Sequence, residues 1–142
     1  MIDAVNAAIQ LVPENGGVIF DAPRIRTGCT VRHEPGSSRF VLLAPGIYLV
    51  QFTGNIALPE GGAVAPVSVA LSVDGETVTG SEAIFTPAAV DEYGNVSIVS
   101  LVRVYGCGAA NVGVAVVNTS GAEINVQDAN LLILRQSGGG NG

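Results

Sequence analysis

Apolar residues alternate with small or polar residues in two stretches of the chain, which is the pattern of β-strands that bury one face. Residues 67–73 read VSVALSV, and the turn dipeptide Asp74-Gly75 joins them to a second strand expected over residues 76–79. Residues 112–116 repeat the alternation as VGVAV. The intervening side chains are serine, alanine and glycine rather than charged residues, so we expect these faces to lie flat against a neighbouring subunit.

Glycine, proline, asparagine and aspartate divide the chain from Gly17 onward into short segments, as they do in sandwiches and barrels. The other segments with strand character cover residues 18–20, 29–33, 40–43, 47–57, 96–104, 123–126 and 130–135. About ten strands and no internal helix are therefore expected. The pattern predicts one all-β domain over residues 16–136 and a flexible glycine-rich tail at residues 137–142.

Residues 1–15 show a different spacing, with apolar side chains three and four positions apart as on one stripe of a helix. The four residues of this stripe are Ile2, Val5, Ile9 and Val12. Because so short a helix is unstable alone in water, three interpretations are open: a coiled-coil seam with its copies, an anchor into a partner, or a strand-like arm on its own domain. We expect a short N-terminal arm that fixes the domain to its partner or to its copies.

The low content of charged residues limits the kinds of partner that the chain is expected to bind. Charged residues make up 13% of the chain, against about 25% in typical soluble domains. A surface with so little charge tends to associate, and contact between subunits removes it from water. The chain is therefore expected to bind copies of itself.

The distribution of charge argues against nucleic acid as a partner. There is no lysine, and the formal net charge of −6 belongs to residues 40–142, since four arginines balance four acidic residues before that point. Binding to nucleic acid needs clustered lysine or arginine. No apolar run reaches the roughly 18 residues of a membrane span, and the N-terminus lacks the features of a signal peptide. We expect neither a nucleic-acid partner nor a membrane partner.

Several short motifs follow one another in a familiar order. They are the segments 17–21 (GVIFD), 38–40 (SRF), 44–50 (APGIYLV), 73–76 (VDGE) and 129–134 (ANLLIL). Their order and spacing resemble the family of tumour necrosis factor and the globular heads of complement-type collagenous proteins. The hairpin motif is most similar to that of bacterial members, the heads of collagen-like spore-surface glycoproteins. The chain departs from those proteins in having no Gly-x-y collagen stalk.

The resemblance implies an antiparallel jelly-roll sandwich that assembles as a tight homotrimer about a threefold axis. For the trimer interface we expect five residues: Tyr48, Val112, Val114, Ala115 and Val116. Sugar-binding surfaces favour exposed aromatic side chains. Tyr93, in the loop at residues 91–95 (DEYGN), is the candidate for contact with a ligand.

The sequence contains no complete catalytic or metal-binding pattern. His33 is the single histidine, expected at the surface at a strand end, and one histidine cannot complete a zinc or facial-triad site within the chain. Asp74 and Glu76 are interpreted as hairpin residues rather than calcium ligands. Cys29 and Cys107 are expected to be free, buried thiols. We therefore expect no enzyme activity, no metal and no cofactor.

These expectations converge on a non-enzymatic, structural or adhesive trimeric head that belongs to a larger assembly. The favoured setting is the surface of a phage virion, as a capsid decoration protein or a fibre head, because the collagen stalk and signal peptide are absent. The alternative is a lectin-like or receptor-binding head on a bacterial spore or cell surface.

Overall fold

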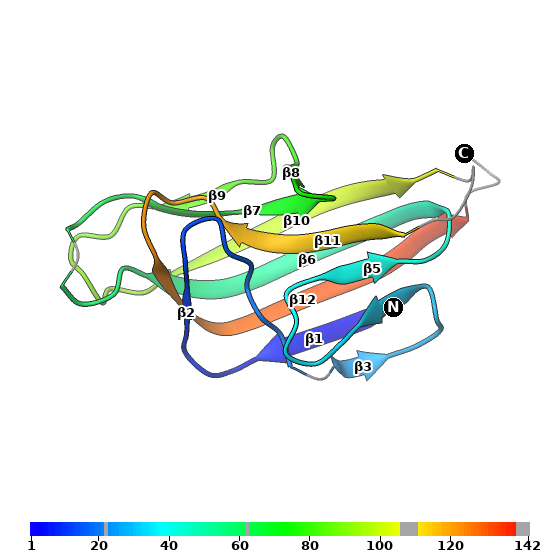
Figure 1. The fold of residues 1–142 in the computed structure, drawn as a ribbon, viewed down its shortest axis with the longest axis horizontal. Helices are drawn as coiled ribbons and strands as arrows, with labels where there is room; N and C mark the ends of the chain where they lie inside the picture. The colour runs from blue at the N-terminus through cyan, green and yellow to red at the C-terminus, as the bar shows by residue number, and fades with distance from the viewer. Residues whose placement is uncertain (22, 62, 106–110, 139–142) are drawn as a thin grey trace.

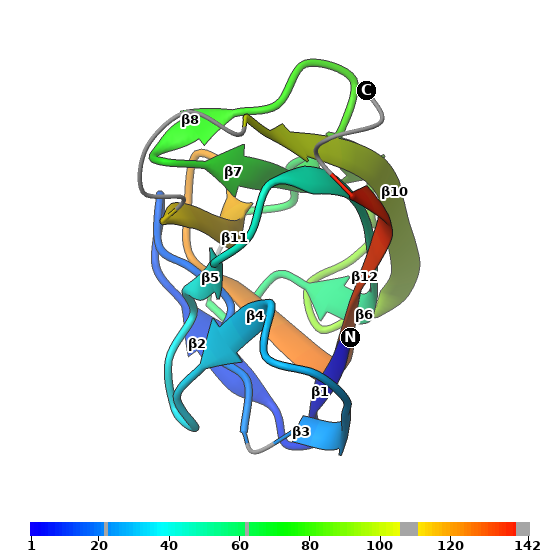
Figure 2. The same ribbon diagram turned by 90° about the vertical axis from the view of Figure 1, so that its right-hand side faces the viewer.

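Twelve β-strands in two stacked sheets form the computed structural model, which describes residues 1–21, 23–61, 63–105 and 111–138 (Figures 1 and 2). The end-on view in Figure 2 shows the two layers, with β10, β6, β12 and β1 in one and β7, β11, β5 and β4 in the other. Within this described part, no helix has the length and apolar character to cross a membrane. The all-β antiparallel sandwich predicted from the sequence is confirmed.

Sheet I has the strand order β10-β6-β12-β1-β3, and β2 pairs with β12 beside this path. All of its pairings are antiparallel. The strands of sheet I are β1 (Ile2–Asn6), β2 (Gln10–Val12), β3 (Pro23–Arg26), β6 (Gly46–Ala57), β10 (Gly94–Val104) and β12 (Ile124–Gly138).

Sheet II has the strand order β4-β5-β11-β7-β8, and β9 pairs with β7 beside this path. Its strands are β4 (Val31–His33), β5 (Phe40–Leu42), β7 (Val67–Val73), β8 (Glu76–Thr77), β9 (Ala83–Phe85) and β11 (Val112–Asn118). Strands β3 and β9 were not predicted, and the strand expected over residues 18–20 is an extended segment held by bridges at Gly17 and Phe20.

The core lies between the sheets and is filled from alternate positions of the long strands. On β6 these positions are Tyr48, Val50 and Phe52, whose side chains are fully buried. The ring of Phe20 packs edge-on against Phe40 and Phe52, with centroids 5.5 Å and 6.4 Å away. Aromatic pairs prefer this arrangement because the positive ring edge meets the negative ring face.

The N-terminal segment forms strands and not the predicted helix. Strand β1 lies between β12 and β3 in sheet I, as Figure 1 shows. Ile2 lies opposite Ile133 of β12. Ile2 and Val12 are buried in the core of the domain. Of the three interpretations, the structure therefore favours a strand-like segment of the chain's own domain. Pairing with β12 satisfies the backbone groups that a lone short helix would leave to water.

The C-terminal segments 123–126 and 130–135, predicted as separate strands, form the single strand β12. Its pairing with β6 shifts register between Gln127 and Asn130. Asp128 at this bulge has a φ of 56°, in the left-handed region that aspartate tolerates better than most residues. Ser137 and Gly138, expected in the flexible tail, belong to β12, and residues 139–142 lie outside the described part.

A fully buried asparagine at the end of β11 links the segment that follows β2 to the turn that precedes β12. The amide of Asn118 donates hydrogen bonds to the carbonyl oxygens of Val12 (3.1 Å), Pro13 (3.2 Å) and Ala122 (2.8 Å). Its carbonyl oxygen accepts one from the Ser120 N–H at 2.9 Å. Both ends of this side chain are thus used, which is required of a polar group buried this deeply.

Replacing Asn118 with leucine is expected to lower the free energy of unfolding by about 3 to 5 kcal/mol. The change keeps the volume but leaves buried carbonyl oxygens and one N–H without partners, each at a cost of about 1–3 kcal/mol. Urea unfolding at one fixed protein concentration measures this difference. The exposed Asn111→Ala is the control; a loss at Asn118 below about 0.5 kcal/mol would show that the network does not hold the fold.

Candidate functional site

The outer face of sheet I carries large apolar side chains. Along β10, Val96, Ile98, Val102 and Val104 point into the core, so the positions between them point outward. Three large side chains at or just after these outward positions are well exposed: Val99 (63%), Leu101 (62%) and Tyr105 (72%).

Strand register extends this exposed row across three strands. Leu101 lies opposite Leu49 of β6, and Leu49 in turn lies opposite Leu134 of β12. Leu49 and Leu134 are half-buried in the single chain. Residues directly opposite on neighbouring strands present their side chains on one face. Val99, Leu101, Tyr105, Leu49 and Leu134 therefore form one surface, here called the apolar outer face.

Polar side chains lie among the apolar residues of this face as well as beside them, since Arg103 occupies the outward position between Leu101 and Tyr105. The guanidinium of Arg103 lies 5.2 Å from the centre of the Tyr105 ring, which is a cation–π contact. Farther across sheet I, Arg24 of β3 forms an ion pair with Asp3 of β1. Surfaces that bind other proteins combine apolar and polar side chains in this way.

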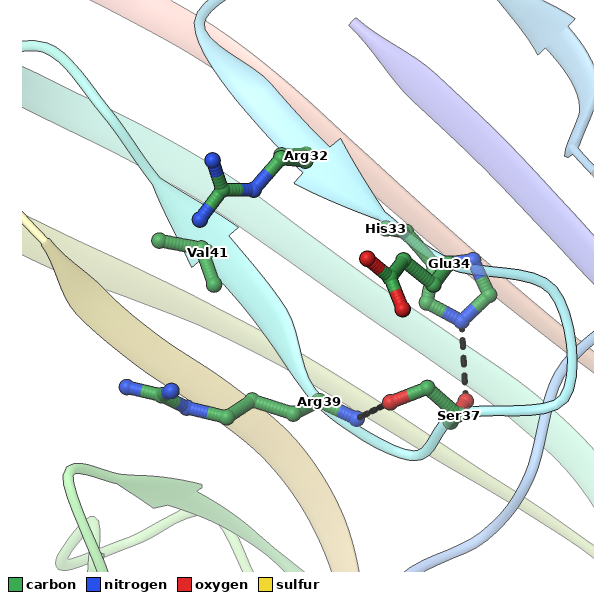
Figure 3. A pocket seen from close by; sticks show the side chains of 6 residues that line it. All are labelled: Arg32, His33, Glu34, Ser37, Arg39 and Val41. Atoms are coloured by element: carbon green, nitrogen blue, oxygen red, sulfur yellow. Dashed lines mark hydrogen bonds between the residues drawn. The ribbon is translucent and has the colours of Figure 1, made fainter.

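The outer face of sheet II carries a hollow of about 200 Å³ (Figure 3). It is lined by Arg32, His33, Glu34, Ser37, Arg39 and Val41. Arg32 and Val41 lie opposite each other on β4 and β5, and Figure 3 shows Arg32 and Arg39 on the two sides of Val41. The Ser37 hydroxyl accepts a hydrogen bond from the Arg39 backbone N–H at 3.1 Å. This hollow is polar and open, in contrast to the apolar outer face.

Solved structures match this architecture over nearly its whole length. The tumour necrosis factor Eiger of S. frugiperda matches with a TM-score of 0.70, 11% identity, and coverage of 96% of this chain and 93% of that one. Murine APRIL at pH 5.0 matches with a TM-score of 0.66, 12% identity, and coverage of 94% and 98%. The globular domain of the zebrafish complement 1qA protein matches with a TM-score of 0.62, 12% identity, and coverage of 95% and 97%.

The fold is the jelly roll of tumour necrosis factor and the complement heads. The resemblance drawn from the sequence motifs is thereby confirmed at the level of the fold. No protein-family model matches the sequence, and no curated protein is similar enough to count as a relative.

In this tumour necrosis factor-like jelly roll, the residues expected at a trimer interface are mostly inside the domain. Tyr48, Val114 and Val116 are fully buried in the core, and the Tyr48 hydroxyl donates a hydrogen bond to the Ala44 carbonyl at 2.7 Å. They are corrected to core residues. Val112 is half-buried and packs against the core. Ala115 is half-buried on the outer face of sheet II, where it remains a candidate contact.

The small-residue face expected to meet a neighbouring subunit is covered by the jelly roll itself. Ser68, Ala70 and Ser72 of β7 are all buried within one chain. The Ser68 hydroxyl hydrogen-bonds the Thr119 hydroxyl at 2.7 Å, and the hairpin strand β8 pairs with β7 at Ser72. The chain therefore needs no second subunit to cover these positions.

The proposed anchoring residues divide into two groups. Ile2 and Val12 are core residues of the jelly roll, which corrects their assignment to an anchor. Val5 is half-buried on β1, while Ile9 is 56% exposed in the bend before β2. Tyr93, the candidate ligand residue, is half-buried directly before β10 rather than fully presented to solvent.

The apolar outer face was not predicted, although the sequence carries a signal for it. Residues 96–105 read VSIVSLVRVY, where both alternating phases contain apolar side chains. A strand that is apolar in both phases is typical of burial on both sides. In the single chain only one side of β10 faces the core, and the apolar side chains on the other side are exposed.

The residues considered for chemistry have structural roles. His33 is buried, contrary to the expected surface position; its ring stacks on Phe40 with centroids 4.0 Å apart, and Nε2 donates to the Ser37 carbonyl at 2.8 Å. Asp74, in the turn between β7 and β8, accepts a hydrogen bond from the Gly113 N–H at 2.8 Å and so holds this turn to β11. Among the described residues, no three His, Cys, Asp or Glu side chains are grouped as metal ligands.

Both cysteines were expected to be free, buried thiols, and the structure describes one of them. Cys29 is exposed in the bend between β3 and β4. Cys107 lies outside the described residues. The expectation of burial is therefore wrong for Cys29.

Proposed function

We propose that the chain is a non-enzymatic head that assembles as a homotrimer through the apolar outer face of sheet I. The observation that carries this proposal is the row of Leu101, Leu49 and Leu134, continued by Val99 and Tyr105. Exposed apolar surface of this kind is unfavourable in water and marks sites of association. In an assembly with closed rotational symmetry, every subunit buries this surface against its neighbours, and no copy of the surface stays exposed.

Threefold assembly through sheet I leaves the outer face of sheet II directed outward. Sheet II carries the polar hollow, the β7–β8 hairpin and the arginines at positions 32 and 39. A trimer of this kind has an apolar interior contact and a polar exterior. This arrangement supports a structural or adhesive head on a larger particle, and we propose the surface of a phage virion as that particle.

A ligand-binding head on a bacterial spore or cell surface is the second candidate. The polar hollow of sheet II favours it, because convergent polar side chains around an open hollow are typical of binding sites. The two candidates differ in what surrounds the gene: capsid genes alongside support the virion, and spore-coat or envelope genes contradict it.

Light scattering of the purified chain is expected to give a mass of about three times 14.3 kDa. The mass should not change at micromolar concentrations, because several apolar side chains per subunit leave water on assembly. A stable, folded monomer at these concentrations would contradict the proposal of a trimer. A dimer would retain the apolar contact but exclude the threefold arrangement.

A further inference from the structure

Two arginines on the outer face of sheet II have no carboxylate partner in the described residues. Arg32 of β4 and Arg39, directly before β5, are both exposed, and the ion pair that the described chain does form is Arg24 with Asp3. The rest of the chain, residues 40–142, carries the whole net charge of −6. Unpaired cations on one face of an acidic protein favour an anionic ligand at that face.

The guanidinium of Arg39 has a defined position on this face, here called its seat, against the backbone of Gly113. Gly113 of β11 lies opposite Val41 of β5, and a Cβ atom at Gly113 would lie 2.8 Å from the guanidinium carbon of Arg39. The guanidinium therefore occupies the space that any larger residue at position 113 would fill. Together with the hydrogen bond from its backbone N–H to Ser37, this seat orients Arg39 before a ligand arrives.

Hollows lie on both sides of Arg39. The first, of about 200 Å³, also contains Arg32 and Glu34, and Figure 3 shows the two arginine side chains extending in the same direction. The second, of about 370 Å³, is lined by Ser38, Arg39, Ser72, Asp74, Gly75, Gly113 and Ala115. The floor of the second hollow consists of small residues, and its border has hydroxyl groups and a carboxylate.

We propose that these two hollows bind a saccharide that carries a carboxylate group, with the carboxylate on Arg32 and Arg39. A guanidinium pairs with a carboxylate through two parallel hydrogen bonds, which gives strength and orientation. Sugar hydroxyl groups both donate and accept, so they complement Glu34, Asp74 and the serine hydroxyls. Beside the Arg39 guanidinium, the small side chains of Ser72 and Ala115 leave room for a sugar ring close to the sheet.

All of these residues belong to one chain and lie on strands of sheet II or in the turns that join them. The saccharide site consequently does not require the apolar outer face or the trimer. A trimer whose hollows bind nothing would overturn this inference alone, and a monomer that binds the sugar would overturn the trimer alone.

Saturation-transfer NMR titrations of the intact protein test the inference with three probes. Glucuronic acid offers a carboxylate and hydroxyl groups, acetate offers the carboxylate, and glucose offers the hydroxyl groups. Glucuronic acid is expected to bind at least about tenfold more tightly than either of the others, because both kinds of contact are then made. Equal binding of acetate would show a simple carboxylate site, such as one for an acidic protein side chain, and would overturn the saccharide. Absence of glucuronic acid binding would also overturn it.

Variants of the same protein distinguish binding at this site from a general effect of net charge. Arg39→Gln and Arg32→Gln are each expected to weaken glucuronic acid binding about tenfold or more, since each removes a charge-assisted pair. Arg26→Gln, on exposed β3 of the other sheet, removes the same charge and should leave binding within about twofold. An equal loss in Arg26→Gln would reduce the effect to net charge and overturn the site.

Gly113→Ala completes the test because it keeps both arginines. The new methyl group takes the seat of the Arg39 guanidinium, whose flexible side chain can move away without unfolding the sheet. Binding of glucuronic acid should weaken about fivefold or more while the mass by light scattering stays unchanged. Unchanged binding in Gly113→Ala would show that the seat of Arg39 has no part in recognition.

Discussion

Replacing Leu101 with glutamate is expected to turn the assembled protein into a folded monomer. Leu101 is 62% exposed in the single chain, so the substitution removes little from the core. In the proposed trimer the same position lies in the apolar contact, where an unpaired carboxylate costs several kcal/mol in every subunit. Light scattering should fall from about three times 14.3 kDa to about 14.3 kDa, with the β-sheet circular dichroism retained.

Ile84→Glu is the matched control for this prediction. Ile84 is also 62% exposed, but it lies on β9 of sheet II, away from the apolar outer face. It is expected to keep the assembled mass. If both variants stay assembled, sheet I is not the contact. If Ile84→Glu alone dissociates the protein, the interface belongs to sheet II.

Deleting residues 1–12 is expected to abolish cooperative folding. The deletion removes β1 and β2, takes Ile2, Ala4 and Val12 out of the core, and separates β3 from the rest of sheet I. Burial of two large apolar side chains alone contributes about 3–6 kcal/mol, and a domain of this size has a net stability of about 5–15 kcal/mol. Loss of the pairing with β12 is added to this, so thermal unfolding followed by circular dichroism should show no cooperative transition.

Ile9→Ser serves as the control for the deletion, because Ile9 is 56% exposed in the bend between β1 and β2. It is expected to change the free energy of unfolding by about 0.5 kcal/mol or less. The opposite result is equally informative. A truncated chain that stays folded and trimeric but no longer attaches to its particle would restore the anchor that the sequence suggested.

The elements that could be predicted from sequence are those whose alternation of apolar and small residues is regular and whose turns are local. The alternation of residues 67–73 and the Asp74-Gly75 turn correctly gave β7 and the hairpin into β8. The N-terminal segment failed because its pairing partner, β12, is more than a hundred residues away in the chain. Its apolar spacing fits a helix locally, and the distant partner decides the outcome.

The candidate site was harder to predict because the alternation along a strand does not show which of the two sets of side chains faces the core. Tyr48 and Leu49 are neighbours on β6, yet Tyr48 is in the core and Leu49 is on the apolar outer face. The interface prediction chose Tyr48 and the valines of β11, which are the inward phase of their strands. Arg39 was missed because its role depends on Gly113, which lies 74 positions later and reaches it through strand pairing.

The central place of β12 in sheet I has a consequence for how the chain is made. β12 lies between β6 and β1, so β1 meets its main partner only when β12, more than a hundred residues later in the chain, has been synthesised. Until then, the inward faces of β1 and β6 are uncovered. Pairing of segments so distant in the chain slows folding, and unpaired strands in a waiting chain promote aggregation. Expression should therefore depend strongly on an intact β12, and chains that stop before β12 are expected in the insoluble fraction.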